Sequence, residues 1–215
     1  MLNRRITALA GATAAATTLG LLATAAPAAA APAPGERSLV TVLDADGNRF
    51  DRKWGDFDIV HKAATTVLGA KPDSAVGVLA DGSTAATAFL PTDRAFRKLV
   101  RQVGGTPQQL RSERAVFDAV ASTFNVNTIE DVLLYHVVPG ATITYHQALR
   151  ADGAALDTAA GAPVRVAKRG HQVYLRDVDT DDANPRVLRK ARDLNKGNKQ
   201  IAHGINRVLR PVDLP

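Results

Sequence analysis

Four stretches in the first two-thirds of the chain repeat apolar residues at helical spacing. Three of them begin at a side chain that suits a helix start, Asp58, Thr92 or Ser112. Thr128 to Asp131 match a capping box ahead of a further apolar run. The pattern therefore predicts helices over residues 58–68, 92–103, 112–123 and 132–135.

Elsewhere the apolar residues are continuous or alternate with polar ones, which is typical of short strands. Strands are predicted over residues 38–43, 76–79, 85–90, 141–145, 155–158, 164–168, 172–178, 200–204 and 205–209. The polar stretch 179–199 is expected to be a surface excursion with one helical turn around 186–193. Helices in the first half and strands in the second, without β-α-β alternation, predict a single α+β domain over residues 38–215.

The N-terminal residues have a different character. Two adjacent arginines precede a stretch rich in Ala, Thr and Leu, and no acidic residue occurs before Glu36. Small residues then offer a cleavage site after Ala30. We interpret residues 1–30 as a secretory signal peptide and 31–37 as a flexible leader. A membrane span is less well supported, since Ala, Thr and Gly dilute the apolar residues. The general secretory and twin-arginine routes both stay open.

Composition narrows the function classes. The 215 residues are 46% hydrophobic, which is enough for one sizeable core. Cysteine is absent, so disulfides, thiolate metal sites, thiol nucleophiles and acyl-anchored lipoproteins are excluded. Without the two signal arginines the net charge falls from +6 to +4, which is mild for a nucleic-acid-binding protein. No run of 18 strongly apolar residues occurs, which excludes a multi-span membrane protein.

The sequence offers little to a catalytic or metal site. None of the five serines lies in a nucleophile motif, although a spatial triad of Ser83 with a histidine stays open. His136 and His146 do not have the spacing of a zinc-protease helix. Aspartates repeat from Asp44 and from Asp177 as in a calcium loop, but the glycine and glutamate that the loop needs are missing. We therefore predict a non-catalytic protein without cofactor or metal.

A basic run follows the aspartates of the polar stretch. It contains Arg186, Arg189, Lys190, Arg192, Lys196 and Lys199. One interpretation is a solvated loop that keeps the protein soluble. The other is a surface that holds an anionic envelope polymer or an acidic glycan through salt-sensitive contacts. Nucleic acid is a poor candidate, since the chain has ten aromatic residues in no stacking pattern.

Three segments resemble, in order, the motifs of the fasciclin (FAS1) domain family. Residues 87–96 (TAFLPTDRAF) resemble the first motif, 133–140 (LLYHVVPG) the central Tyr-His motif, and 201–211 (IAHGINRVLRP) the closing motif. The resemblance spans residues 57–212 and looks like the bacterial secreted single-domain type. It implies an α+β fold, a wedge of two small sheets with a helical cluster contributed mainly by the N-terminal half.

The resemblance also implies a function. It suggests a protein that binds extracellular protein or polysaccharide in cell-surface or matrix adhesion. We expect this protein to be secreted and monomeric. Release is favoured over covalent anchoring, since no apolar tail or sorting motif follows Pro211. Tyr135 and His136 stand where the family's proposed adhesion epitope lies; alternatively, their apolar neighbours pack the core and their polar ends are satisfied there. His203 is expected to hold the closing strand by buried hydrogen bonds.

Two departures from the closing motif accompany the resemblance. Asn206 stands where the family usually has aspartate, so that an ionic partner would be replaced by a neutral hydrogen bond. Ala202 and Gly204 flank His203 where bulkier residues are usual, which predicts a thinner core at that point.

Overall fold

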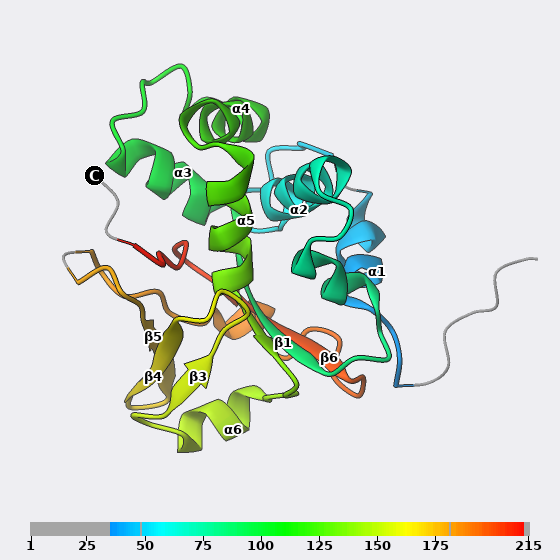
Figure 1. The fold of residues 1–215 in the computed structure, drawn as a ribbon. Coiled ribbons are helices and arrows are strands. Elements are labelled where there is room, and N and C mark those ends of the chain that lie inside the picture. Colours follow the sequence, from blue (N-terminus) through cyan, green and yellow to red (C-terminus); the bar gives the residue numbers. More distant parts are fainter. Residues whose placement is uncertain (1–34, 48, 181, 213–215) are drawn as a thin grey trace, which may run out of the picture. The chain divides into compact units, whose positions relative to one another are not determined.

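The computed structural model describes residues 35–47, 49–180 and 182–212 (Figure 1). The helices are α1 (Leu39–Leu43), η1 (Asp44–Asp46), α2 (Asp58–Ala70), η2 (Ala75–Ala80), α3 (Asp93–Gln102), α4 (Glu113–Thr123), α5 (Val126–Tyr135), α6 (Tyr145–Arg150) and η3 (Arg189–Ala191), where η marks a 3₁₀ helix. The strands are β1 (Ala86–Pro91), β2 (Val137–Pro139), β3 (Ala155–Asp157), β4 (Pro163–Arg169), β5 (Gln172–Arg176) and β6 (Gln200–Ile205). The mixed α+β fold is thus confirmed.

The strands form two sheets of three. In the first sheet β1 lies between β2 and β6, antiparallel to β2 and parallel to β6. Phe89 of β1 is the register partner of His203 of β6, so the first and closing motifs lie side by side. In the second sheet β4 lies between β3 and β5, and both pairings are antiparallel.

The apolar residues gather in three clusters. The first, with Ile59, Phe96 and Val116, holds α2 to α5 together. The second joins β4, β5 and α6 to the first sheet, and the third packs α1 against it. Figure 1 shows α2, α3 and α4 grouped together, while α5 runs from this group toward the second sheet. Both β1 and β6 are buried along their whole length. This burial explains the apolar run of β1, whereas the buried polar residues of β6, Gln200 and His203, bind backbone groups.

Two predicted strands are wrong because side chains cap a helix there. The stretch 38–43 forms α1, in which the Ser38 hydroxyl accepts the N–H of Thr41 at 3.2 Å. Leu39 and Leu43, four residues apart, then lie buried on one face. The stretch 76–79 lies in η2, whose first turn is capped by the side chain of Ser74.

Capping also corrects the middle of the chain. Residues 141–145 are not a strand: Thr144 and Gln147 form a capping box that starts α6. Helix α5 begins before the expected cap at Thr128, because Asn125 Oδ1 accepts the N–H of Thr128 at 3.0 Å.

The last predicted strand, 205–209, is also wrong, since β6 ends at Ile205.

The stretch 179–199 is more than a surface excursion. Val187 is buried and bridges to Ile205, and Leu194 bridges to Ala202, so the stretch lies along β6. The expected helical turn is η3. A Cβ on Gly204 would lie 2.6 Å from the Cβ of Ala191, so glycine is what allows η3 to approach the strand. The core is therefore filled here rather than thin.

The N-terminal expectations fall largely outside the described residues. This applies to the signal peptide, 1–30, and to residues 31–34 of the leader. The rest of the leader is held by the stretch just described: Lys199 N–H donates to Gly35 O at 2.8 Å, and Arg37 N–H donates to Asn198 Oδ1 at 3.0 Å. Within the part of the chain that the structure covers, no helix combines the length and apolarity that crossing a membrane requires.

Candidate functional site

Tyr135 and His136 lie in the core. Tyr135 is fully buried, and its hydroxyl donates to Pro163 O at 3.2 Å. His136 is 3% exposed; its Nδ1 lies 2.6 Å from Val132 O, and its Nε2 accepts the N–H of Leu209 at 2.8 Å. These partners fix the tautomer, with the proton on Nδ1. Neither side chain offers a surface to a partner: Tyr135 holds the end of α5 to β4, and His136 holds it to Leu209.

The closing-motif histidine has a similar structural role. His203 Nδ1 accepts the N–H of Asp193 at 3.1 Å, and Nε2 donates to Ile143 O at 2.8 Å. The imidazole ring lies between the rings of Phe89 and Tyr145, with centroid distances of 5.9 and 6.5 Å. Two segments flanking β6 are thereby joined through one side chain.

Because His136 is buried, the stability of the fold should decrease in mild acid. Burial lowers its pKa to about 4, whereas in the unfolded chain it should titrate near the ordinary histidine value of 6.5. The contribution of a neutral His136 is therefore complete above pH 6.5 and is lost as the pH falls toward 4. The pKa of His203 is lowered by burial as well.

We expect the stability advantage of the wild type over a His136→Gln variant to shrink by about 2 kcal/mol between pH 7 and pH 5. Taking the difference in unfolding free energy between the two proteins cancels the contributions of other titrating groups that both share, such as Asp177. Urea unfolding of the two proteins at several pH values measures it. A difference that stays constant with pH would show that His136 does not titrate as its burial requires.

Five carboxyl groups, of which those of Asp58, Asp93 and Glu113 are buried, gather where α2, α3 and α4 begin. Oxygens of Asp56, Asp58 and Asp93 lie within 4.8 Å of one another, and so do those of Asp51, Asp58 and Glu113. The spacing would suit a hard divalent cation. Two of these groups, however, bind the backbone: Asp93 Oδ1 accepts the N–H of Ile59, and Glu113 Oε2 that of Arg52, each at 2.9 Å. These bonds favour a structural role at the helix starts.

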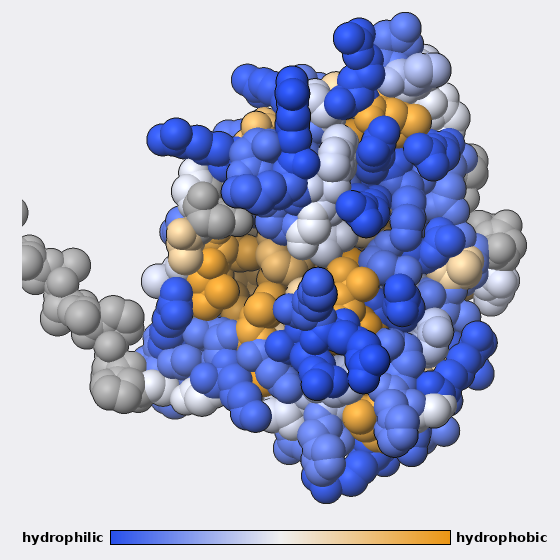
Figure 2. All heavy atoms as spheres, turned by 180° about the vertical axis from the view of Figure 1, so that it is seen from behind, coloured by the Kyte–Doolittle hydropathy of each residue, from blue (hydrophilic) through white to orange (hydrophobic). Residues whose placement is uncertain are grey.

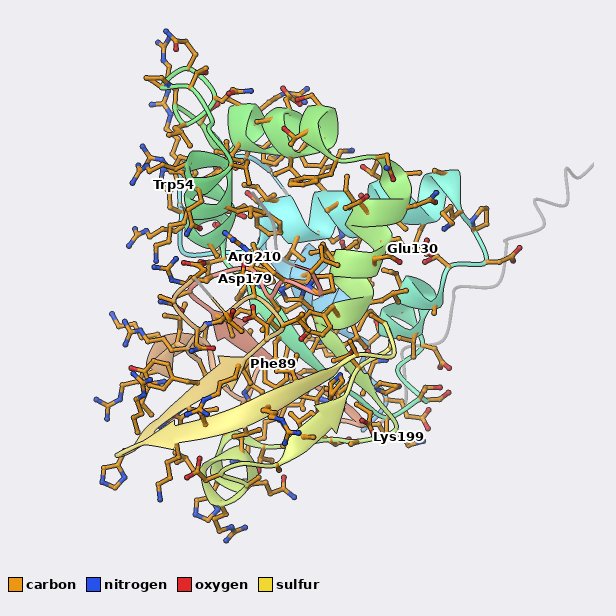
Figure 3. The ribbon with its side chains drawn as sticks, turned by 60° about the vertical axis from the view of Figure 1, so that its left-hand side comes forward. Trp54, Phe89, Glu130, Asp179, Lys199 and Arg210 are labelled. Atoms are coloured by element: carbon orange, nitrogen blue, oxygen red, sulfur yellow. The ribbon has the colours of Figure 1, made fainter. Side chains whose placement is uncertain are left out.

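A buried ion pair anchors the start of the stretch 179–199 (Figure 3). Arg210 Nη1 donates to Asp179 Oδ2 at 2.7 Å, and Nη2 donates to Gln102 Oε1 of α3 at 2.9 Å. The N–H of Arg210 also donates to Asp177 Oδ2 at 3.0 Å. The aspartates that resemble a calcium loop are thus used to bind arginine. Burial raises the pKa of Asp177 to about 6.

The predicted basic residues lie at the surface. Arg186, Arg189, Lys190 and Arg192 are exposed. Within the described residues, no ion pair involves any of the four. Arg192 stacks over the ring of Tyr145 at 4.7 Å from its centroid.

Helix α3 brings two further cations, which the sequence analysis missed, to the same segment. Arg94 and Lys98, one turn apart, line a cleft of about 190 Å³ together with Arg186. Trp54 lines this cleft as well. The helical spacing of the two cations was visible in the sequence, but their position beside residue 186 depends on the fold. We call these two residues with Arg186, Arg189, Lys190 and Arg192 the basic face.

The surface otherwise favours polar contacts. Figure 2 shows hydrophilic side chains over most of one face, with hydrophobic ones gathered in a hollow near its middle. Ser83, the serine left open as a nucleophile, donates its hydroxyl hydrogen bond to Asp81 at 2.6 Å in its own turn. The geometry thus brings Arg94, Lys98 and Arg186 together at one cleft. The buried histidines, His136 and His203, instead bind backbone groups.

The structure is a mixed α+β domain with two small three-stranded sheets. Residues 64–211 match the family model described as Fasciclin domain. This match covers more than half of the chain, so the chain belongs to the Fasciclin domain family. Such domains are often adhesion-related and typically non-catalytic, and they are common in extracellular or cell-surface proteins.

A solved structure agrees on the fold. The chain is similar to a FAS1 domain pair from the insect cell adhesion molecule Fasciclin I, with a TM-score of 0.53 and 15% sequence identity. The similarity covers 80% of this chain and 50% of that one, so this chain spans about half the length of the pair. No curated protein matches the chain significantly.

Proposed function

We propose that this domain is a secreted, non-catalytic adhesion module that holds an anionic polysaccharide of the cell surface or extracellular matrix on its basic face. The observation that carries the proposal is the set of exposed cations on residues 186–192, which have no ion-pair partner among the described residues. Cations without internal partners attract polyanions by salt-sensitive contacts.

A protein partner bound through Tyr135 and His136 is the second candidate, since the family resemblance implies it. Burial argues against direct contact, because both side chains are at most 3% exposed. The signal-like N-terminal pattern and the extracellular character of the family support export. The domain is proposed to act as a monomer.

The proposal predicts binding that depends on charge and salt. At about 50 mM salt the protein should co-sediment with immobilised polygalacturonate and not with neutral dextran. The fraction bound to polygalacturonate should fall steeply as the salt concentration rises to about 500 mM. Equal retention on dextran, or no retention on polygalacturonate at low salt, would contradict the proposal.

A charge-reversal variant locates the contact. Arg189→Glu combined with Lys190→Glu should weaken polygalacturonate binding about tenfold or more, because two contact cations become repulsive. The matched control carries the same charge change at Arg111→Glu and Lys168→Glu, two exposed positions outside the basic face. Equal losses in both variants would indicate that net charge, rather than the basic face, determines binding.

A further inference from the structure

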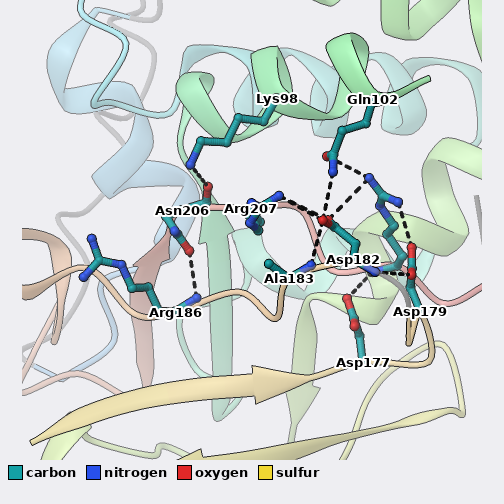
Figure 4. A network of polar contacts seen from close by, with 10 residues as sticks. Lys98, Gln102, Asp177, Asp179, Asp182, Ala183, Arg186, Asn206 and Arg207 are labelled. Carbon is teal, nitrogen blue, oxygen red and sulfur yellow. Dashed lines mark hydrogen bonds and ion pairs between the residues drawn. The ribbon is translucent and has the colours of Figure 1, made fainter. Parts of the chain in front are cut away.

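The cleft that three residues of the basic face line has walls from three parts of the chain. Trp54 precedes α2, Lys98 lies on α3, and Arg186 lies in the stretch that follows β5. Figure 4 shows Lys98 descending from α3 toward Asn206, with Arg186 on the other side of that asparagine. The volume of about 190 Å³ is below the usual range for drug-sized ligands and suits one small unit of a larger molecule.

The charge within the cleft is positive. Lys98 Nζ donates to Asn206 O at 3.1 Å. The pKa of Lys98 is lowered, first by burial and then by the positive charges of Arg207, Arg94 and Arg186. Asp182 acts in the opposite direction, but it already binds Arg207 at 3.1 Å. Cations that repel one another in a partly buried cleft favour a bound anion.

Asn206 contributes to this charge by being neutral. Its Oδ1 accepts the N–H of Arg186 at 2.8 Å, and its own N–H donates to Arg186 O at 3.2 Å. The asparagine therefore fixes the backbone that carries Arg186 while adding no negative charge beside Lys98. An aspartate here would keep the same acceptor and offset one of the cations.

Trp54 gives the cleft an aromatic wall. Its carbonyl oxygen accepts the N–H of Arg94 at 3.0 Å, which ties it to the first turn of α3. The guanidinium of Arg97 lies over the ring, 4.6 Å from its centroid. Trp54 lies at the edge of the helical part and is half-buried (Figure 3). The part of the indole that lines the cleft offers an apolar surface that is already fixed in place, with little entropy to lose on binding.

We propose that this cleft is a subsite for a single acidic sugar residue, a uronate, whose ring packs on Trp54 and whose carboxylate is held by Lys98 and Arg186. The inference rests on the proposed function and names its ligand class: the polymer is an acidic glycan read one unit at a time. The aromatic wall provides what a simple counter-ion site lacks, a surface for the sugar ring.

The tryptophan makes the test direct, because Trp54 is the one tryptophan of the chain. Tri-galacturonate should change its fluorescence in a saturable way at constant ionic strength. Neutral maltotriose and inorganic phosphate should produce responses at least about fivefold weaker, since each lacks one of the two recognised features. An equal response to phosphate would replace the sugar subsite by a plain anion site, and an equal response to maltotriose would remove the role of charge.

A matched pair of variants tests the residues. Asn206→Asp should weaken tri-galacturonate binding about fivefold or more by offsetting the cleft cations. Gln108→Glu adds the same charge at an exposed position away from the cleft and should leave binding unchanged. Thermal unfolding verifies that both variants fold, and Lys98→Gln gives a second loss of binding should Asn206→Asp unfold.

The outcomes separate this inference from the proposed function. If polygalacturonate still binds to the basic face but neither Asn206→Asp nor Lys98→Gln affects tri-galacturonate binding, the subsite is wrong and the proposed function stands. If polygalacturonate does not bind the wild type at all, the proposed function fails, and the subsite fails with it.

Discussion

Replacing Asp179 by alanine is expected to lower the free energy of unfolding by about 3–5 kcal/mol. The Asp179 and Arg210 side chains are 1% and 5% exposed, so the variant leaves a guanidinium charge in the interior without its closest carboxylate. Asp182, at 3.6 Å from Arg210, compensates only in part. Urea unfolding at pH 7 measures the loss.

Two comparisons make this result specific. Glu36→Ala removes one partner of the exposed Lys199–Glu36 pair and should cost no more than about 1 kcal/mol. Asp179→Leu combined with Arg210→Met removes both buried charges and should recover much of the stability lost in Asp179→Ala. If Asp179→Ala were as mild as Glu36→Ala, the ion pair would not anchor the stretch 179–199 as described.

Elements with a strong period were predictable from sequence. The apolar stripe of α3 and the continuous apolar run of β1 appear within one or two residues of their expected positions. The spacing of apolar residues in such an element reflects which of its faces is buried. This spacing is the same whatever the element packs against, so it can be recognised in the sequence. The order of the three motifs similarly predicted the family and the mixed fold.

Short elements failed because their starts depend on capping. The stretch before α6 alternates apolar and polar residues as a strand would, yet Thr144 and Gln147 are spaced as a capping box. That signal was present in the sequence and outweighs the alternation. In α1, five residues are too few for a helical stripe to be distinguished from a strand.

The candidate sites depended on contacts between distant residues. Burial of His136 requires Leu209, and the cleft joins Trp54 to α3 and to Arg186. Positions this far apart in sequence share no local pattern. The basic run in the sequence therefore identified Arg186 as a candidate but not the residues that lie beside it in the fold. The asparagine at 206 was visible as a departure, but its consequence followed only from its place beside Lys98.

The second large effect is expected at the carboxyl group of Asp93, which is fully buried. Burial, and next a hydrogen bond with the carboxyl group of Asp56, raise its pKa to about 9. Asp93 is therefore protonated in the folded protein at pH 7, whereas it is ionised in the unfolded chain. Its contribution to stability is complete below pH 3.8 and is lost as the pH rises through 9.

An Asp93→Asn variant should therefore be more stable than the wild type by about 2–4 kcal/mol at pH 8. The amide keeps an oxygen for the N–H of Ile59, which lies 2.9 Å from Asp93 Oδ1, and donates to Asp56 as the protonated acid does. Between pH 7 and pH 9 the wild type should lose up to about 1.4 kcal/mol per pH unit through this group, whereas the variant should not.

Urea unfolding at pH 7, 8 and 9 separates this explanation from a general effect of removing a charge. Asp118→Asn, an exposed change on α4, replaces a carboxyl group by the same amide and should keep the wild-type dependence on pH. Parallel curves for the wild type and Asp93→Asn would mean that Asp93 is ionised in the folded state. The carboxyl cluster would then hold its charges by other contacts, and its structural role at the helix starts would need a different electrostatic basis.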